Sequence, residues 1–268
     1  GYSEFIYDIS EFINFGEKEN LLTVRVNHKY ESDSRWYTGS GIYRKVTIIV
    51  KDEINIDNYG VFISTEEADS NRAVISIKTT VNNEQNCEEE INLVNEIYDN
   101  DNNLITQVEK EVELKGQQAK KINHKFEIKR PKLWSTDSPY LYKCLTKIKK
   151  NNELLDDLST KFGVRTIEFN PDHGFYLNDK NMKLKGVCVH HDAGCLGAAV
   201  TKNVWRRRLN KLRELGANAI RMSHNPHMPE LYDLCDEMGF LVIDEAFDEW
   251  EGVKNKWSTG HNVYPPLH

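Results

Sequence analysis

Apolar and polar residues alternate in different ways along this chain. Residues 22–26 and 43–48 alternate with a period of two, which is typical of β-strands, and a Gly-rich corner at 38–41 lies between them. Two or three strands do not form a stable sheet alone. Residues 1–50 are therefore predicted to be the C-terminal part of a larger β-sandwich.

Short alternating runs continue from residue 51 to about 166. Five clear examples lie at 73–77, 91–97, 108–114, 122–128 and 141–148, and turn-rich segments such as 99–103 separate them. About seven short strands at this spacing are typical of an immunoglobulin-like β-sandwich. No cluster of reactive side chains is visible in residues 51–166, so this domain is interpreted as a scaffold.

The pattern changes again after residue 166. Three buried-strand patterns, at 184–189, 219–222 and 240–243, alternate with two helical patterns. The first helix begins near Lys202 and stops at Gly216, and the second has Pro229 in its first turn and stops at Gly239. Residues 167–268 are therefore predicted to be the first three βα units of a (β/α)8 TIM barrel. A barrel cannot close on three strands, so the chain is predicted to be a fragment.

Each of these three strands ends in ionisable side chains. His190 follows the first strand, Arg221 and His224 accompany the second, and Asp244 and Glu245 follow the third. The carboxyl ends of parallel strands meet on one face, and barrel enzymes build their active sites there. This pattern predicts an enzyme.

Composition narrows the possible partners and location. A net charge of -7 and a pI near 5.8 argue against nucleic acid, because phosphate binding needs a basic face. No apolar run reaches the length of a membrane span, so no membrane partner is expected. The five dispersed cysteines are expected to be free thiols in a reducing compartment, which favours a cytoplasmic over a secreted protein. Location stays open, because a signal peptide could precede Gly1.

Five segments carry a family resemblance. Residues 218–226 (NAIRMSHNP) and 231–245 (LYDLCDEMGFLVIDE) closely resemble the signature of glycoside hydrolase family 2. Residues 35–44 (RWYTGSGIYR), 133–142 (LWSTDSPYLY) and 174–187 match the same family in the same order. This is the family of bacterial β-galactosidases, β-glucuronidases and β-mannosidases.

The resemblance implies both an architecture and a reaction. The family order is a sugar-binding jelly-roll-like domain, an immunoglobulin-like domain and a TIM barrel. Its members hydrolyse β-glycosides with retention through two glutamates, which follow the fourth and seventh barrel strands. Neither strand is present here. The parent enzyme is therefore expected to cleave terminal β-D-galactosides, with β-glucuronidase or β-mannosidase activity as alternatives, and this chain is expected to be inactive alone.

The same resemblance assigns roles around the sugar. His190 and His224 would bind sugar hydroxyls, and Arg221 would orient a neighbouring carboxylate as a fork of donors. Asp244 and Glu245, which follow the third strand, are also expected to be substrate-binding residues. His190 and His224 could instead be structural residues, which is the interpretation given to His227. Trp250 could stack on a sugar face or cover the unfinished core.

The resemblance also bears on a metal site. Lac-type β-galactosidases of the family hold magnesium through a carboxylate at the position of Glu249, so the full-length enzyme could bind Mg²⁺ there. The pattern departs two residues on, where Glu251 replaces a histidine. It also departs at Ser34, where lac-type enzymes place an aspartate, and this puts a contact from that loop in doubt.

Two further expectations concern partners. The substrate would be a β-linked oligosaccharide or glycoside. Copies of the chain are also expected to associate, either through the open edge of the incomplete barrel or as a native homo-oligomer. The alternative from another class is a non-catalytic carbohydrate-binding or assembly module, and binding that survives deletion of residues 181–268 would favour it.

Overall fold

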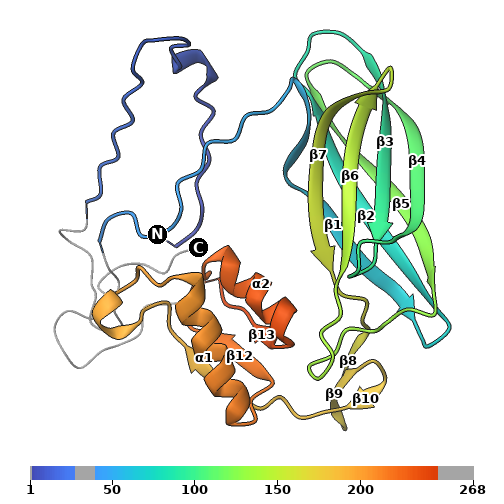
Figure 1. The fold of residues 1–268 in the computed structure, drawn as a ribbon, viewed down its shortest axis with the longest axis vertical. Helices are drawn as coiled ribbons and strands as arrows, with labels where there is room; N and C mark the ends of the chain where they lie inside the picture. Colours follow the sequence, from blue (N-terminus) through green and yellow to red (C-terminus); the bar gives the residue numbers. More distant parts are fainter. Residues whose placement is uncertain (1, 28–39, 247–268) are drawn as a thin grey trace. The chain divides into compact units, whose positions relative to one another are not determined.

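The computed structural model describes residues 2–27 and 40–246. The chain divides into two compact units (Figure 1). The first, called the sandwich unit, comprises residues 47–185 and 234–241. The second, called the barrel unit, comprises residues 1–46, 186–233 and 242–268. The domain boundaries expected after residues 50 and 166 stay predictions.

Seven strands form the main body of the sandwich unit. They are β1 (Ile54–Ala68), β2 (Arg72–Asn83), β3 (Glu89–Tyr98), β4 (Leu104–Leu114), β5 (Gln118–Lys129), β6 (Tyr142–Lys150) and β7 (Glu153–Phe162). One sheet has the order β1-β2-β5 and the other β4-β3-β6-β7, and all neighbours pair antiparallel. This is the immunoglobulin-like sandwich that the spacing predicts.

Strict alternation explains why these sequences form a sandwich. Ile122, Phe126 and Ile128 of β5 point inward, and the residues between them are exposed or polar. Phe126 and Ile128 pack in the core with Ile75 of β2 and Ile97 of β3. A second apolar cluster, which includes Ile54, Leu93 and Ile148, extends the core. Burial of these side chains is the main force that holds the two sheets together.

Three polar side chains interrupt the apolar core. Asn95 of β3 lies with its Nδ2 2.7 Å from Nδ1 of His124 on β5, and the hydroxyl of Thr146 on β6 donates to its Oδ1 at 2.7 Å. All three are buried. A buried polar group without a partner costs about 1–3 kcal/mol. These hydrogen bonds therefore favour the one packing of the two sheets in which all three side chains meet.

Trp134 ties the end of the sandwich to the second helix. Its backbone N–H donates to the carbonyl of Val164, and its indole Nε1 donates to the carbonyl of Asp236 at 2.8 Å. The ring is 1% exposed, and a Cβ at Gly163 would lie 2.8 Å from it. A glycine is therefore needed at 163. A small antiparallel sheet follows, formed by β8 (Ile167–Asn170), β9 (Gly174–Leu177) and β10 (Lys180–Asn181).

The start of the barrel contains one sheet and two helices. Its sheet has the order β11 (Gly186–Val189), β12 (Ala219–Met222), β13 (Leu241–Ile243), with β11 and β12 parallel. Helices α1 (Lys202–Glu214) and α2 (Pro229–Met238) connect the strands. Gly216 and Gly239 have φ values of 82° and 71° just after the two helices, which is the left-handed conformation that glycine adopts most readily.

The first fifty residues differ from expectation. The strands expected at 22–26 and 43–48 are not formed, and the described part of residues 1–50 contains one 3-10 turn, Ser10–Phe12. Leu22 and Val46 are 69% and 66% exposed. The physical reason is that a strand needs a neighbour to satisfy its backbone and cover its apolar face, and the described residues offer these segments none.

All five cysteines are free thiols. Within residues 2–27 and 40–246, no helix combines the length and the apolar character that crossing a bilayer requires.

Candidate functional site

The candidate site is the set of side chains at the carboxyl ends of β11, β12 and β13, called the strand-end rim. Val189 pairs with Met222 across β11 and β12, and the Ser223 N–H donates to the Val189 carbonyl at 3.0 Å. The two strands therefore end at the same level. A Cβ at Gly186 would collide with the Ala219 carbonyl, so glycine at 186 permits this close approach.

Glu245 holds two other members of the rim. Nε of Arg221 donates to its Oε1 at 2.6 Å, and Nη2 of Arg221 contacts the same oxygen. Nδ1 of His224 lies 2.7 Å from Oε2. Arg221 and His224 are also 3.3 Å apart, between Nη2 and Nδ1. One carboxylate therefore contacts both a guanidinium and an imidazole, and two nitrogens of Arg221 share one of its oxygens.

The electrostatics of this group keep Glu245 ionised. Its partial burial alone would raise the pKa of the carboxyl. The hydrogen bonds from His224 and Arg221 and their charges outweigh this effect and hold that pKa below its ordinary value. A carboxyl held in this way is a poor proton donor near neutral pH. Its role in the rim is to orient its neighbours.

His190 is the third side chain of the rim. Its ring centroid lies 5.4 Å from that of His224 in an edge-on arrangement. It therefore stands beside the Arg221–Glu245–His224 group, as expected from its place after β11. Asp244 has a different position, because its carboxylate accepts a hydrogen bond from the Tyr232 hydroxyl at 2.9 Å and not from Arg221 or His224.

The neighbouring histidines are structural in their contacts. His191 packs against Tyr2 and Tyr43, with ring centroids 4.9 and 6.1 Å away. His227 is buried against Trp205, and this burial lowers its pKa to about 4. A neutral, buried imidazole contributes packing, which agrees with the structural role expected for His227.

Two contacts to the rim were not predicted from the sequence. Arg44 donates to the carbonyl oxygens of Tyr2 and Pro226, each at 2.6 Å, so it supports the loop that carries His224. Nη1 of Arg221 lies 3.4 Å from Sγ of Cys188, and the hydrogen bonds from Arg221 and then Ser223 lower the pKa of that thiol. Arg44 is the last residue of the matched segment 35–44, and that match was the one feature of the sequence that could have indicated its role. Nothing in the sequence indicated the contact of Cys188, a single cysteine within a strand pattern.

The predicted Trp250 and the predicted metal ligand Glu249 lie outside the described residues. Within the described part of the chain, no three His, Cys, Asp or Glu side chains are arranged to hold a metal ion. The rim thus offers donors and acceptors for hydroxyl groups. Of its two described carboxylates, that of Glu245 contacts Arg221 and His224, and that of Asp244 accepts a hydrogen bond from Tyr232.

Sequence profiles of one family match both parts of the chain. The profile described as glycosyl hydrolases family 2 matches residues 54–165. The profile for the family 2 TIM barrel domain matches residues 170–265. Together the two matches cover most of the chain, and they place a sandwich domain before the start of the TIM barrel, as the sequence predicts.

Individual relatives carry two different names. A β-galactosidase of Bacteroides ovatus, BoGH2A, is 39% identical over 254 residues, which are 95% of this chain and 30% of that protein. A putative β-glucuronidase of Formosa agariphila is 38% identical over 251 residues, 93% of this chain and 23% of that protein. The chain therefore spans less than a third of the length of these relatives.

Solved structures agree on the fold. The crystal structure of a glycosyl hydrolase family 2 member from Bacteroides cellulosilyticus matches with a TM-score of 0.78 and 35% identity, over 82% of this chain and 30% of that one. A Bacteroides uniformis β-glucuronidase matches with a TM-score of 0.67 and 31% identity, over 72% of this chain and 24% of that one.

Proposed function

Because the chain belongs to glycosyl hydrolase family 2, we propose that the full-length enzyme hydrolyses terminal β-D-galactosides with retention and that the strand-end rim of this chain holds the sugar. The observation that carries this proposal is the contact of Glu245 with both Arg221 and His224. It fixes an imidazole at the strand ends, where barrel enzymes bind their substrates.

The proposed role of the rim is to recognise hydroxyl groups. An imidazole whose Nδ1 is anchored to a carboxylate keeps one orientation, so a hydrogen bond from a sugar hydroxyl to the ring costs little ordering entropy. Such a bond accelerates the reaction when it strengthens as the sugar ring flattens toward the transition state. His224, with His190 beside it, is proposed to make these contacts, and Arg221 and Glu245 are proposed to position His224.

The charge of the rim favours a galactoside over a glucuronide. A uronate carboxylate is best bound by an arginine or lysine that has no other anion to satisfy. Arg221, the guanidinium of the described rim, is already paired with Glu245. Arg44 donates hydrogen bonds to two backbone carbonyls. A neutral sugar fits this arrangement better.

The test is a substrate panel on the full-length gene product. We expect kcat/KM for nitrophenyl β-D-galactoside to exceed that for the β-D-glucuronide and the β-D-mannoside by about tenfold or more, which corresponds to one good hydrogen bond in the transition state. His224→Ala should lower kcat/KM for the galactoside about ten- to hundredfold. A preference for the glucuronide, or full activity in His224→Ala, would contradict the proposal.

A further inference from the structure

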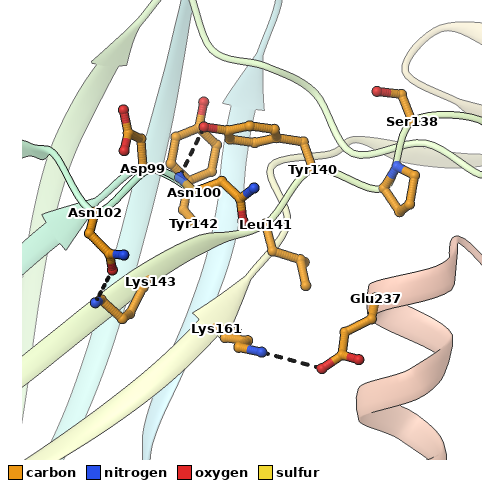
Figure 2. Close-up of a pocket in the computed structure, with 11 residues that line it drawn as sticks. Asp99, Asn100, Asn102, Ser138, Tyr140, Leu141, Tyr142, Lys143, Lys161 and Glu237 are labelled. Atoms are coloured by element: carbon orange, nitrogen blue, oxygen red, sulfur yellow. Dashed lines mark hydrogen bonds and ion pairs between the residues drawn. The ribbon is translucent and has the colours of Figure 1, made fainter.

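The sandwich unit contains a pocket with both polar and apolar lining, and no residue of the rim contributes to it. Its volume is about 510 Å³, within the range of about 300–1,000 Å³ of small-molecule sites. It lies among the turn between β3 and β4, the segment that leads into β6, Lys161 of β7 and Glu237 of α2 (Figure 2). We call it the turn pocket. No sequence pattern indicated it, because its residues come from four separate segments.

The turn that forms one wall is held rigidly. The Asp99 carboxylate accepts hydrogen bonds from the backbone N–H groups of Asp101 and Asn103, at 2.9 and 2.8 Å, and from the Asn103 side chain. The bonds from Asn103 lower the pKa of the Asp99 carboxyl. The Asn100 N–H donates to the hydroxyl of Tyr140 at 3.1 Å, as Figure 2 shows. A wall fixed in this way loses little entropy when a ligand binds.

The charged groups at the pocket are already engaged. Lys143 donates to Oδ1 of Asn102 at 2.7 Å, and Nζ of Lys161 lies 3.3 Å from Oε1 of Glu237 (Figure 2). The carboxylate of Asp99 accepts the hydrogen bonds of the turn. The charges of the lining side chains are thus compensated or occupied, and this favours a neutral ligand over an ionic one.

The other lining groups suit a saccharide. The amides of Asn100 and Asn102 and the hydroxyl of Ser138 together offer donors and acceptors, and each sugar hydroxyl is both. Pro139 and Tyr140 add apolar surface, which a sugar ring contacts through its C–H faces. Amide, hydroxyl and aromatic groups on a fixed wall are the composition of a site for a small polar ligand.

We propose that the turn pocket binds one unit of a neutral saccharide and serves as an accessory substrate site in the sandwich unit. The choice of a saccharide over another neutral polyol rests on the proposed function. Binding itself does not depend on it, because no residue of the strand-end rim lines the pocket. The site would hold a long substrate to the protein and so raise its local concentration.

The experiment is a titration of the ¹⁵N-labelled 268-residue chain with lactose, followed by amide chemical shifts. We expect the shifts of Asn100, Asn102 and Ser138 to move together with a Kd in the millimolar range. The double variant Asn100→Ala, Asn102→Gly should weaken binding about tenfold or more, because two hydrogen bonds are lost. Glycine is chosen at 102 because the φ of that residue is 62°.

A matched control and a second variant separate the outcomes. Asn151→Gly makes the same change at a residue with φ of 50° in the β6–β7 turn, at the opposite end of β6, and should leave lactose binding unchanged. His224→Ala should leave the pocket shifts in place. Shifts confined to the rim and lost in His224→Ala would overturn the turn pocket but keep the proposed function. Tighter binding of sodium glucuronate than of lactose at the pocket would overturn its neutral ligand class.

Discussion

Among single residues, Glu245 organises the strand-end rim, because it contacts both Arg221 and His224 through different oxygens. The sequence could predict that these three residues meet, since all of them follow or end neighbouring strands. It could not predict that Asp244, one residue earlier, turns to Tyr232. Adjacent residues after a strand point in different directions, and only the packing around them decides which one enters a site.

The buried His227 leads to a prediction about pH. Burial lowers its pKa to about 4, below the value of about 6.5 expected in an unfolded chain. As the pH falls, the imidazole therefore binds a proton in the unfolded state at a higher pH than in the folded state. The neutral imidazole contributes full stability above about pH 6.5, and the contribution is lost as the pH falls toward 4.

An NMR titration of the histidine ring signals checks this prediction. The His227 signal should keep its neutral shift down to about pH 5 in the folded chain, and His227→Gln identifies the signal. In urea the same ring should titrate near about pH 6.5. A midpoint near about 6.5 in the folded chain would show that the ring is hydrated, contrary to its burial.

Among secondary-structure elements, prediction succeeded where an alternating segment has a partner strand in one of the two sheets of the sandwich, or where a glycine ends a helix. The strands β2 to β6 and both helices lie where the alternation and the glycine stops place them. The strands expected at 22–26 and 43–48 are not formed, although their alternation is equally clear. Alternation with a period of two predicts which face of a strand would be buried. It does not supply the partner strand that the segment needs in order to form.

The polar set in the sandwich core gives an element-scale prediction. Asn95→Ala would leave the buried His124 Nδ1 and Thr146 hydroxyl without their partner, so the free energy of unfolding should fall by about 1–3 kcal/mol. Urea unfolding measures the change. Asn123→Ala, at an exposed position of β5, is the matched control and should change stability by less than about 0.5 kcal/mol. Equal effects of the two variants would contradict a structural role for the set.

For the whole molecule, the three-stranded sheet of the barrel unit determines which strand edges are exposed. The described residues supply the sheet β11-β12-β13, in which β11 and β13 are both edges. Val187 and Ile243 on these edges are 47% and 49% exposed. Self-association through such an edge stays a prediction, as does a native homo-oligomer. The chain also spans less than a third of the relatives named above.

We predict that the 268-residue chain alone does not turn over nitrophenyl β-D-galactoside. The rim holds its carboxylate ionised against Arg221 and His224, so that carboxylate cannot protonate a leaving group. The assay uses chain purified from a host without β-galactosidase. Turnover that persists in this preparation and disappears in Glu245→Gln would show that the rim itself carries the chemistry.

The sequence by itself determined the order of the sandwich and the βα units, the helix ends and the convergence of His190, Arg221 and His224. These follow from local periodicity, from glycine conformation and from the common direction of parallel strands. Only the tertiary structure decided that Glu245 rather than Asp244 joins the rim, that Arg44 supports the His224 loop, and that the turn pocket exists. These features depend on residues far apart in the chain, and no local pattern records which distant side chains come into contact.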